Sequence, residues 1–299
     1  MEKKKKVRHG TSDRIFLTVN TLLLTIFLVI ILYPLLYVVV SSFATGSVRL
    51  SLTLIPEKIS FTSYKAVFED PEIWIGYRNS LLYLVISTVA SLIVTVCCAY
   101  PLSIPSFKGG KVLMPLCLFT MYFGGGLIPT YLVMRDLHLI NTIWAVTIPG
   151  ALSVSNMIVI RTYFKTQIPA ELWESAQLDG CGNIRFLLSI ALPLSTAVLA
   201  VIALYCAVGS WNSYFGAMIY LKDRDKYPLT IFIREILVTN SNDMMDQMVT
   251  DLSLGAELET RKNLMKYAII VVSSLPMMII YPFVQKYFVK GVMVGAVKG

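Results

Sequence analysis

Long apolar runs separated by short polar stretches set the pattern of this sequence. Six of these runs reach the roughly 20 residues that a helix needs to cross the hydrocarbon core of a bilayer. They cover approximately residues 15–40, 81–103, 112–134, 140–160, 192–218 and 267–284. The pattern predicts an all-α integral membrane protein with six transmembrane helices. Residues 15–284 are expected to form the membrane domain, with residues 1–14 and 285–299 outside it.

The composition agrees with this prediction, and the basic residues orient the chain. Hydrophobic residues make up 56% of the 299 residues, charged residues only 15%, and the mean hydropathy is +0.68, all far from the values of a soluble domain. Lysine and arginine are dense in segment 1–14 and in the short loops on the same side. By the positive-inside rule, we expect both termini and the loop 161–193 in the cytoplasm. The first run is too long for a signal peptide and is expected to remain as an anchor.

Several kinds of chemistry lack the residues that they need. The sequence contains no G-x-x-x-x-G-K-[ST] motif for nucleotide phosphates, no H-E-x-x-H, no G-x-S-x-G and only two histidines. The five cysteines show no metal-ligand spacing, and the six runs hold essentially no charged side chain, which disfavours an ion-coupled carrier. We therefore expect no catalytic site, metal site or bound cofactor on this chain. Its basic residues flank membrane spans, so we expect contact with lipid and none with nucleic acid.

One polar stretch between the fourth and fifth runs, WESAQLDGCGNIRFLLSIALP, is strongly ordered. Pro169, just before it, suits a first helical turn, and the acidic residues that follow suit the positive end of the helix dipole. Gly180 can end the helix in a left-handed conformation. These signals predict a short helix over 169–178 that is too polar to span a membrane.

A second helix is predicted after it, with Asn183 as its cap, and Pro193 marks where this helix turns into the fifth span. On the first helix, Ala176 is small enough to let the backbone of another protein approach. Together the two helices form a rigid bracket on the cytoplasmic face. Because the bracket joins a membrane helix directly, it is suited to transmit force.

The spacing in this stretch resembles the coupling motif of the membrane subunits of ATP-binding-cassette (ABC) importers, E-A-A-x3-G-x9-I-x-L-P. Serine stands where the motif has one of its alanines. The resemblance implies that the first helix docks into a cleft on an ATPase subunit. The residues that it implicates in coupling are Glu171, Glu174, Ser175, Ala176, Leu178, Asp179, Gly180, Leu192 and Pro193.

The resemblance covers nearly the whole chain. The string FGGGLIPTYLVM and the ending AVKG look like the carbohydrate-uptake branch, of the maltose-permease type, and most like its permeases for complex oligosaccharides or polysaccharides. Such an importer lies in the bacterial cytoplasmic membrane. It consists of two homologous permeases, here implied to form a heterodimer, two ATPase subunits that bind ATP and magnesium, and an extracytoplasmic solute-binding protein. The tail residues Gly291, Gly295 and Lys298 are implied to contact the ATPases. An amino-acid importer permease, a membrane anchor or receptor and an intramembrane enzyme stay open as alternatives.

Recognition of a sugar inside the membrane domain needs aromatic faces and hydrogen-bonding side chains. The candidates for this pathway are Tyr122, Tyr131, Asn156, Trp211, Asn212, Tyr214 and Tyr220. An aromatic belt at the membrane surface, or polar bridges between packed helices, would explain the same residues. The glycines 124–126, with Pro129, predict a break in the third span past its midpoint.

Overall fold

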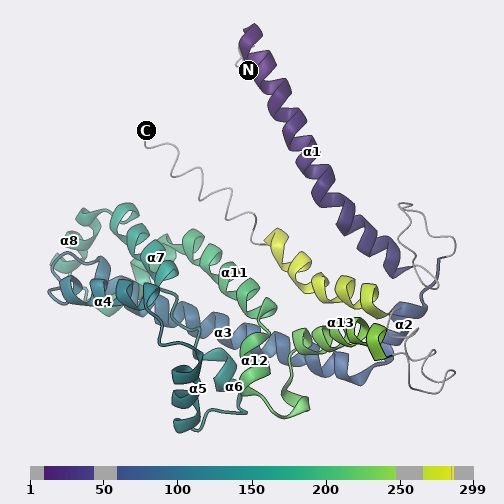
Figure 1. The fold of residues 1–299 in the computed structure, drawn as a ribbon. Helices are drawn as coiled ribbons and strands as arrows, with labels where there is room; N and C mark the ends of the chain where they lie inside the picture. Colours follow the sequence, from purple (N-terminus) through teal and green to yellow (C-terminus); the bar gives the residue numbers. More distant parts are fainter. Residues whose placement is uncertain (1–9, 44–58, 247–264, 284, 286–299) are drawn as a thin grey trace. The chain divides into compact units, whose positions relative to one another are not determined.

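The computed structural model describes residues 10–43, 59–246, 265–283 and 285, and over these residues the chain is helical, with no β-strand (Figure 1). The longer helices are α1 (Thr11–Ser42), α2 (Thr62–Glu69), α3 (Pro71–Ser103), α4 (Gly110–Tyr122), α5 (Leu127–Asp136), α7 (Val154–Gln167), α8 (Ala170–Leu178), α11 (Thr196–Asn212), α13 (Leu229–Asp246) and a last helix, Met265–Phe283. The shorter ones are α6 (Ile143–Thr147), α9 (Asn183–Phe186), α10 (Leu192–Leu194) and α12 (Phe215–Tyr220). The tail positions Gly291, Gly295 and Lys298 lie outside the described residues.

The chain divides into two compact units. The first comprises the described parts of residues 1–69 and 239–272. In it, the end of α1 meets α2 through a hydrogen bond of 2.6 Å between the hydroxyls of Ser42 and Tyr64, and the ring of Tyr64 lies 5.0 Å from that of Phe43. The second unit comprises the described parts of residues 70–238 and 273–299 and holds both candidate sites.

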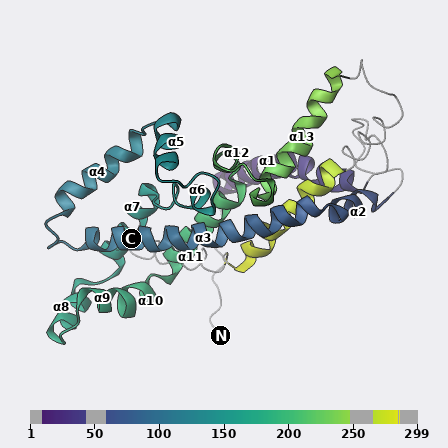
Figure 2. The same ribbon diagram turned by 90° about the horizontal axis from the view of Figure 1, so that it is seen from below.

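Helix α3 is the central element of the second unit, and α7 and α11 pack along it (Figures 1 and 2). Ala99, Met157 and Ile160 are completely buried between these helices. Helix α3 begins at Pro71, well before the predicted span at 81–103, because the Asp70 carboxylate caps its first turn by accepting a hydrogen bond of 2.9 Å from the Glu72 amide. The span therefore forms only the later part of a longer helix.

Three described helices are long and apolar enough to cross a membrane: α1, α3 and Met265–Phe283. The predicted run at 112–134 forms a bent pair of helices, with a bend of 114° between α4 and α5. The predicted run at 192–218 begins near the end of the first arm of a second bent pair, with a bend of 83° between Asn183–Leu194 and α11. The first of these breaks was predicted. It occurs where Gly126 adopts a φ of +87°, which only glycine takes readily.

The run at 140–160 was wrongly expected to be one helix. It splits into α6 and α7 around a turn at residues 149–150. Pro149 has no amide hydrogen with which to continue the helical hydrogen bonds, and Gly150 follows directly, so the helix ends here. The run at 192–218 was likewise too long, since α11 ends at Asn212 and α12 is a separate helix.

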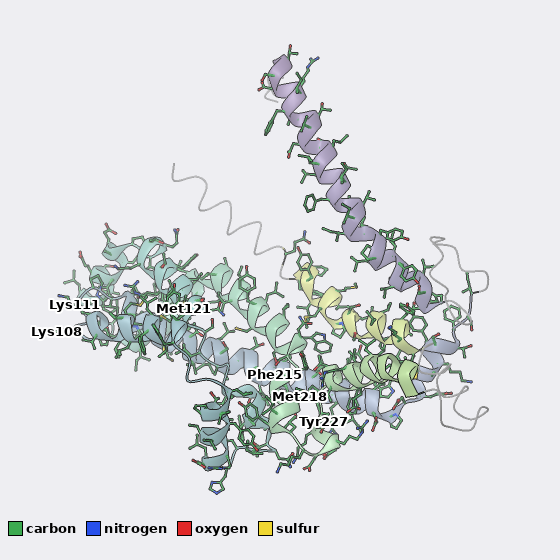
Figure 3. All side chains as sticks on the ribbon, in the orientation of Figure 1. Lys108, Lys111, Met121, Phe215, Met218 and Tyr227 are labelled. Carbon is green, nitrogen blue, oxygen red and sulfur yellow. The ribbon has the colours of Figure 1, made fainter. Side chains whose placement is uncertain are left out.

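The segment after α12 is tied back to the first turns of α3. Arg224 forms ion pairs with Glu72 and with Glu235, and the Asn79 side chain donates to the carbonyl oxygens of Asp225 and Tyr227 at 2.7 and 3.0 Å. Figure 3 places Tyr227 with Phe215 and Met218, whereas Lys108 and Lys111 lie at the opposite end of α3, the end that also carries α8 (Figures 1 and 3). The second unit therefore has one end that holds α8 and two lysines, and another that holds this ion-pair cluster.

Candidate functional site

Helix α8 ends in a well-formed glycine cap. Gly180 has a φ of +73°, its amide donates to the Gln177 carbonyl at 3.0 Å, and the Cys181 amide donates to the Ala176 carbonyl at 2.8 Å. This pair of bonds is the Schellman motif, which satisfies the last carbonyl groups of a helix and reverses the chain direction. The predicted helix and its glycine stop are confirmed, with Pro169 as the residue just before the first turn.

The second arm of the bracket differs from the prediction at two points. Gly182, and not Asn183, is the cap of α9, because Gly182 has extended backbone angles and its carbonyl accepts the first helical hydrogen bond, 2.9 Å from the Phe186 amide. A π-helical turn, Leu187–Ala191, follows, and the sharp bend into α11 lies at Ser195 instead of at Pro193. We keep the name bracket for residues 169–195.

Aromatic side chains fix the bracket to α3 and α7. The rings of Trp173 and Phe186 join its two arms edge to face, with centroids 4.6 Å apart. Tyr100 of α3 donates a hydrogen bond of 3.0 Å to the Asn183 carbonyl, and its ring meets that of Phe164 on α7 at 6.0 Å. Paired aromatic rings of this kind contribute beyond their buried area. The bracket is thus part of the packed core of the second unit.

The residues implicated in coupling divide into exposed and buried sets. Ala176 is buried beneath α8 in the chain's own core, so the expectation that its small side chain faces a partner is wrong. The exposed set is Glu171, Glu174, Ser175, Leu178, Asp179, Gly180 and Pro193, while Leu192 is half-buried. Leu178 is 90% exposed at the tip of α8. The outer face therefore combines three carboxylates with one fully projecting leucine.

A second feature, a cavity of about 290 Å³, lies between α3, the α6–α7 segment and α11. Nine of its sixteen lining residues carry a hydroxyl group, among them Ser80, Ser87 and Ser91 on one face of α3 and Ser153, Ser210 and Ser213 opposite. Asn156 and Cys206 also line it. The Ser91 hydroxyl lies 3.2 Å from the Cys206 sulfur, and the Asn156 amide donates to the same sulfur at 3.8 Å. We call this space the serine cavity.

Of the seven residues named from the sequence as a substrate pathway, only Asn156 lines the serine cavity. Tyr122 is 74% exposed at the end of α4, and Tyr131 stacks on Tyr220 at 6.2 Å. Trp211 is buried and donates to the Ser273 carbonyl at 3.2 Å. The amide of Asn212 bonds within its own helix, and Tyr214 lies under the guanidinium of Arg234. Apart from the Tyr131–Tyr220 pair, these seven residues do not share one site.

Sequence reasoning missed the serines, although one signal was available. Ser80, Ser87 and Ser91 are spaced by seven and four residues, which places them on one face of a helix in an otherwise apolar run. The opposite wall of the cavity comes from segments more than fifty residues away along the chain. No local pattern reveals such a pairing.

Comparison with known proteins shows the family. Protein LplC of Bacillus subtilis (strain 168) is 37% identical over 300 residues, which cover 97% of this chain and 98% of that protein. The polygalacturonan/rhamnogalacturonan transport system permease protein YtcP of the same organism is 37% identical and covers 92% of this chain and 96% of its own length. A solved bacterial ABC transporter involved in the import of the acidic polysaccharide alginate has a chain with a TM-score of 0.83 and 36% identity, covering 95% of this chain and 100% of that one. This chain belongs to the permease subunits of ABC importers.

As such a permease, the chain is a multi-pass protein of the bacterial cytoplasmic membrane, in agreement with its long apolar helices. A scan against protein-family models finds no match. Within the described residues, the bracket presents an exposed polar surface, and the serine cavity is an internal space lined in part by hydroxyl groups.

Proposed function

We propose that this permease carries an oligosaccharide or polysaccharide fragment into the cell, driven by ATP hydrolysis on separate ATPase subunits. The permease and transport-system names of its relatives, several of which specify oligosaccharides or polysaccharides, support a carbohydrate as cargo. In this proposal the chain crosses the membrane six times, with some spans bent or broken, and both termini lie in the cytoplasm. Amino-acid import and a mere anchoring role have no support among these names.

The observation that carries the proposal is the construction of the bracket. Its first helix presents Glu171, Glu174 and Leu178 outward while Trp173 and Ala176 are held in the core. A surface of this kind offers a projecting apolar anchor surrounded by charge, which is how the energetic centre of many protein interfaces is built. The bracket continues directly into α11, so a displacement of α8 is passed to a membrane helix.

The proposed partners are those that an ABC importer permease implies. We propose that α8 docks on one of two ATPase subunits, each of which binds ATP and magnesium, and that a second, homologous permease provides the other docking helix. An extracytoplasmic solute-binding protein delivers the cargo. The C-terminal tail, with Gly291, Gly295 and Lys298, is proposed to contact the ATPases. The catalytic step then lies entirely outside this chain, which acts as a transducer.

The docking role is tested by changing Leu178 to serine. Because this side chain is 90% exposed, its loss leaves the folded permease intact, whereas an interface loses the burial of a leucine, about 1.5–3 kcal/mol, or roughly a 10- to 100-fold weaker contact. We expect membrane expression at the wild-type level together with loss of sugar uptake and of substrate-stimulated ATPase activity. Leu137→Ser, at another exposed leucine (61% exposed) directly after α5, is the matched control and should transport normally.

A Leu178→Ser importer with wild-type uptake and ATPase stimulation would show that α8 does not dock as proposed. Deletion of the gene for this chain alone tests the broader function. Uptake of oligosaccharides that persists after deletion would favour an anchor, because an anchor is not needed for passage of the cargo.

A further inference from the structure

We propose that the serine cavity binds the hydroxyl groups of a single region of the sugar, about one ring in size, and makes no contact with carboxylate groups. This inference rests on the proposed function and adds to it the chemical class that the cavity accepts. Its consequence is that the cavity does not distinguish an acidic sugar from its neutral counterpart.

The first argument for the proposal comes from the residues that line the cavity. Nine of its sixteen lining residues have a hydroxyl group, and Asn156 adds an amide. Several of these hydroxyl groups are used within the chain: those of Tyr83 and Thr147 donate to backbone carbonyls, and that of Ser80 accepts from a backbone amide. A hydroxyl group both donates and accepts, and an amide does the same through its two ends, so the groups left over match the paired donor and acceptor character of sugar hydroxyls. Tyr205, 57% exposed at the rim on α11, adds an aromatic ring of the kind that packs on the apolar face of a sugar.

The second argument is that the residues lining the cavity are uncharged. Its lining, all of it in the described part of the chain, contains no aspartate, glutamate, lysine, arginine or histidine. A carboxylate moved out of water needs a cation or several strong donors to offset its desolvation, and arginine is the usual partner. A uronic acid would therefore place its carboxylate elsewhere. This matters because the alginate importer that resembles this permease handles an acidic polymer.

The third argument is that the cavity is small. At about 290 Å³, it lies at the lower limit of the roughly 300–1,000 Å³ typical of small-ligand sites. It accepts a small part of an oligosaccharide and not the whole molecule. Passage of a long cargo would then proceed by successive contacts of its rings with the same hydroxyl groups.

Cys206 provides a direct readout, because its sulfur lies inside the cavity beside Ser91 and Asn156. A variant of the assembled importer that keeps Cys206 and has alanine at the other four cysteines is treated in membrane vesicles with a small, water-soluble methanethiosulfonate reagent. Galactotriose and trigalacturonate are the neutral and acidic probes. A second variant that keeps only Cys181, in the bracket, is the control for effects away from the cavity.

We expect galactotriose to slow the labelling of Cys206 by about tenfold at about ten times its dissociation constant, as simple mass action requires. Trigalacturonate should protect to the same extent, and neither sugar should alter the labelling of Cys181. Protection by neither sugar, or by only one of the two, would overturn the inference.

A separate variant, Gly209→Leu, is designed to close the cavity without disturbing the fold. A Cβ atom at Gly209 would meet no heavy atom within 4 Å, so Gly209→Leu fills open space along the cavity wall. We expect it to assemble normally and to reduce uptake at least tenfold, whereas Val208→Leu, on the same helix but outside the lining, should have no effect. Normal uptake by Gly209→Leu would overturn the cavity inference and leave the proposed function standing. Protection of Cys206 by sugar in an importer that transports no carbohydrate would support the cavity inference and overturn the proposed function.

Discussion

The bracket and the serine cavity lie in the same unit but are built in opposite ways. The bracket is one continuous stretch of about 27 residues whose turns are set by local hydrogen bonds, such as the glycine cap at Gly180. The cavity is assembled from four separate parts of the chain, and most of its polar groups meet only when α3, the α6–α7 segment and α11 pack together. The bracket is polar on its outer surface and apolar beneath, whereas the cavity holds its polar groups inside, among apolar helices.

This difference indicates how each region responds to substitution. In the bracket, buried positions such as Ala176 control folding, and exposed positions such as Leu178 are free to serve a partner. In the cavity, the polar groups that would meet a ligand also bridge the packed helices, as Ser91 and Cys206 do. Folding and function are separable in the bracket, and they overlap in the cavity.

The largest effect is expected for Ala176→Glu, which tests whether the bracket is anchored from beneath. Ala176 is 7% exposed and packs against the aromatic core of the second unit, so a glutamate there places an unpaired charge in an apolar site, at a cost of several kcal/mol. We expect little folded permease in the membrane, measured by size-exclusion chromatography in detergent.

Ser175→Glu is the matched control, since Ser175 is the exposed neighbour of Ala176. It should fold normally and affect only the contact with the ATPase. Normal folding of Ala176→Glu, with loss of ATPase docking alone, would show instead that Ala176 faces the partner.

The bracket was largely predictable because its signals are local. Pro169 and Gly180 mark the two ends of α8 through backbone rules that act within a few residues, and the structure confirms both ends. Prediction failed where neighbouring residues suited the same structural role, such as the helix cap or the position of the bend. Asn183 and Gly182 both suit a helix cap, and the bend fell two residues beyond Pro193 because the π-helical turn accommodates the proline, which has no amide hydrogen.

The cavity was not predictable from the sequence for a different reason. A serine in an apolar helix suits close helix packing as well as a polar site, so Ser87 or Ser210 alone decides nothing. The aromatic residues named in advance found partners of their own, as Tyr131 did with Tyr220 and Trp211 did with Ser273. Which helices share a cavity depends on long-range packing, and the breaks at residues 149–150 and 195 change that packing.

An intermediate effect is expected for Gly180→Leu, which tests whether the local cap sets the shape of the bracket. No heavy atom lies within 4 Å of a Cβ at this position, so the cost comes from the φ of +73°, about 1–2 kcal/mol for a residue other than glycine. We expect folded permease with weakened coupling, measured as the ratio of sugar taken up to ATP hydrolysed.

Gly180→Asn separates backbone strain from bulk, because asparagine tolerates the left-handed conformation. It should retain most of the coupling. Equal loss in the asparagine and leucine variants would indicate that a glycine is needed for contact with the partner and not for the turn.

A smaller effect is expected for Tyr100→Phe, which removes the one hydrogen bond by which this side chain holds the bracket to α3. The hydroxyl donates to the Asn183 carbonyl at 3.0 Å, and a bond of this kind contributes about 0.5–1.5 kcal/mol. The ring, with its contact to Phe164, is retained. We expect a thermal unfolding midpoint that is a few degrees lower, with uptake preserved at growth temperature. An unchanged midpoint would show that the aromatic contacts alone position the bracket.

The smallest effect is expected at Ser195, where the bracket bends into the helix that lines the cavity. Ser195 is completely buried, and its hydroxyl oxygen finds no hydrogen-bond partner among the described residues. A buried polar group without a partner lowers stability, so Ser195→Ala should leave the unfolding midpoint unchanged or raise it slightly. Ser103→Ala is the matched control, because Ser103 is also buried but donates to the Tyr100 carbonyl at 2.6 Å, and its loss should lower the midpoint. If Ser195→Ala proved the more damaging of the two, the Ser195 hydroxyl would have a partner in the assembled importer, and the bend would be a point of contact between the two regions instead of a passive joint.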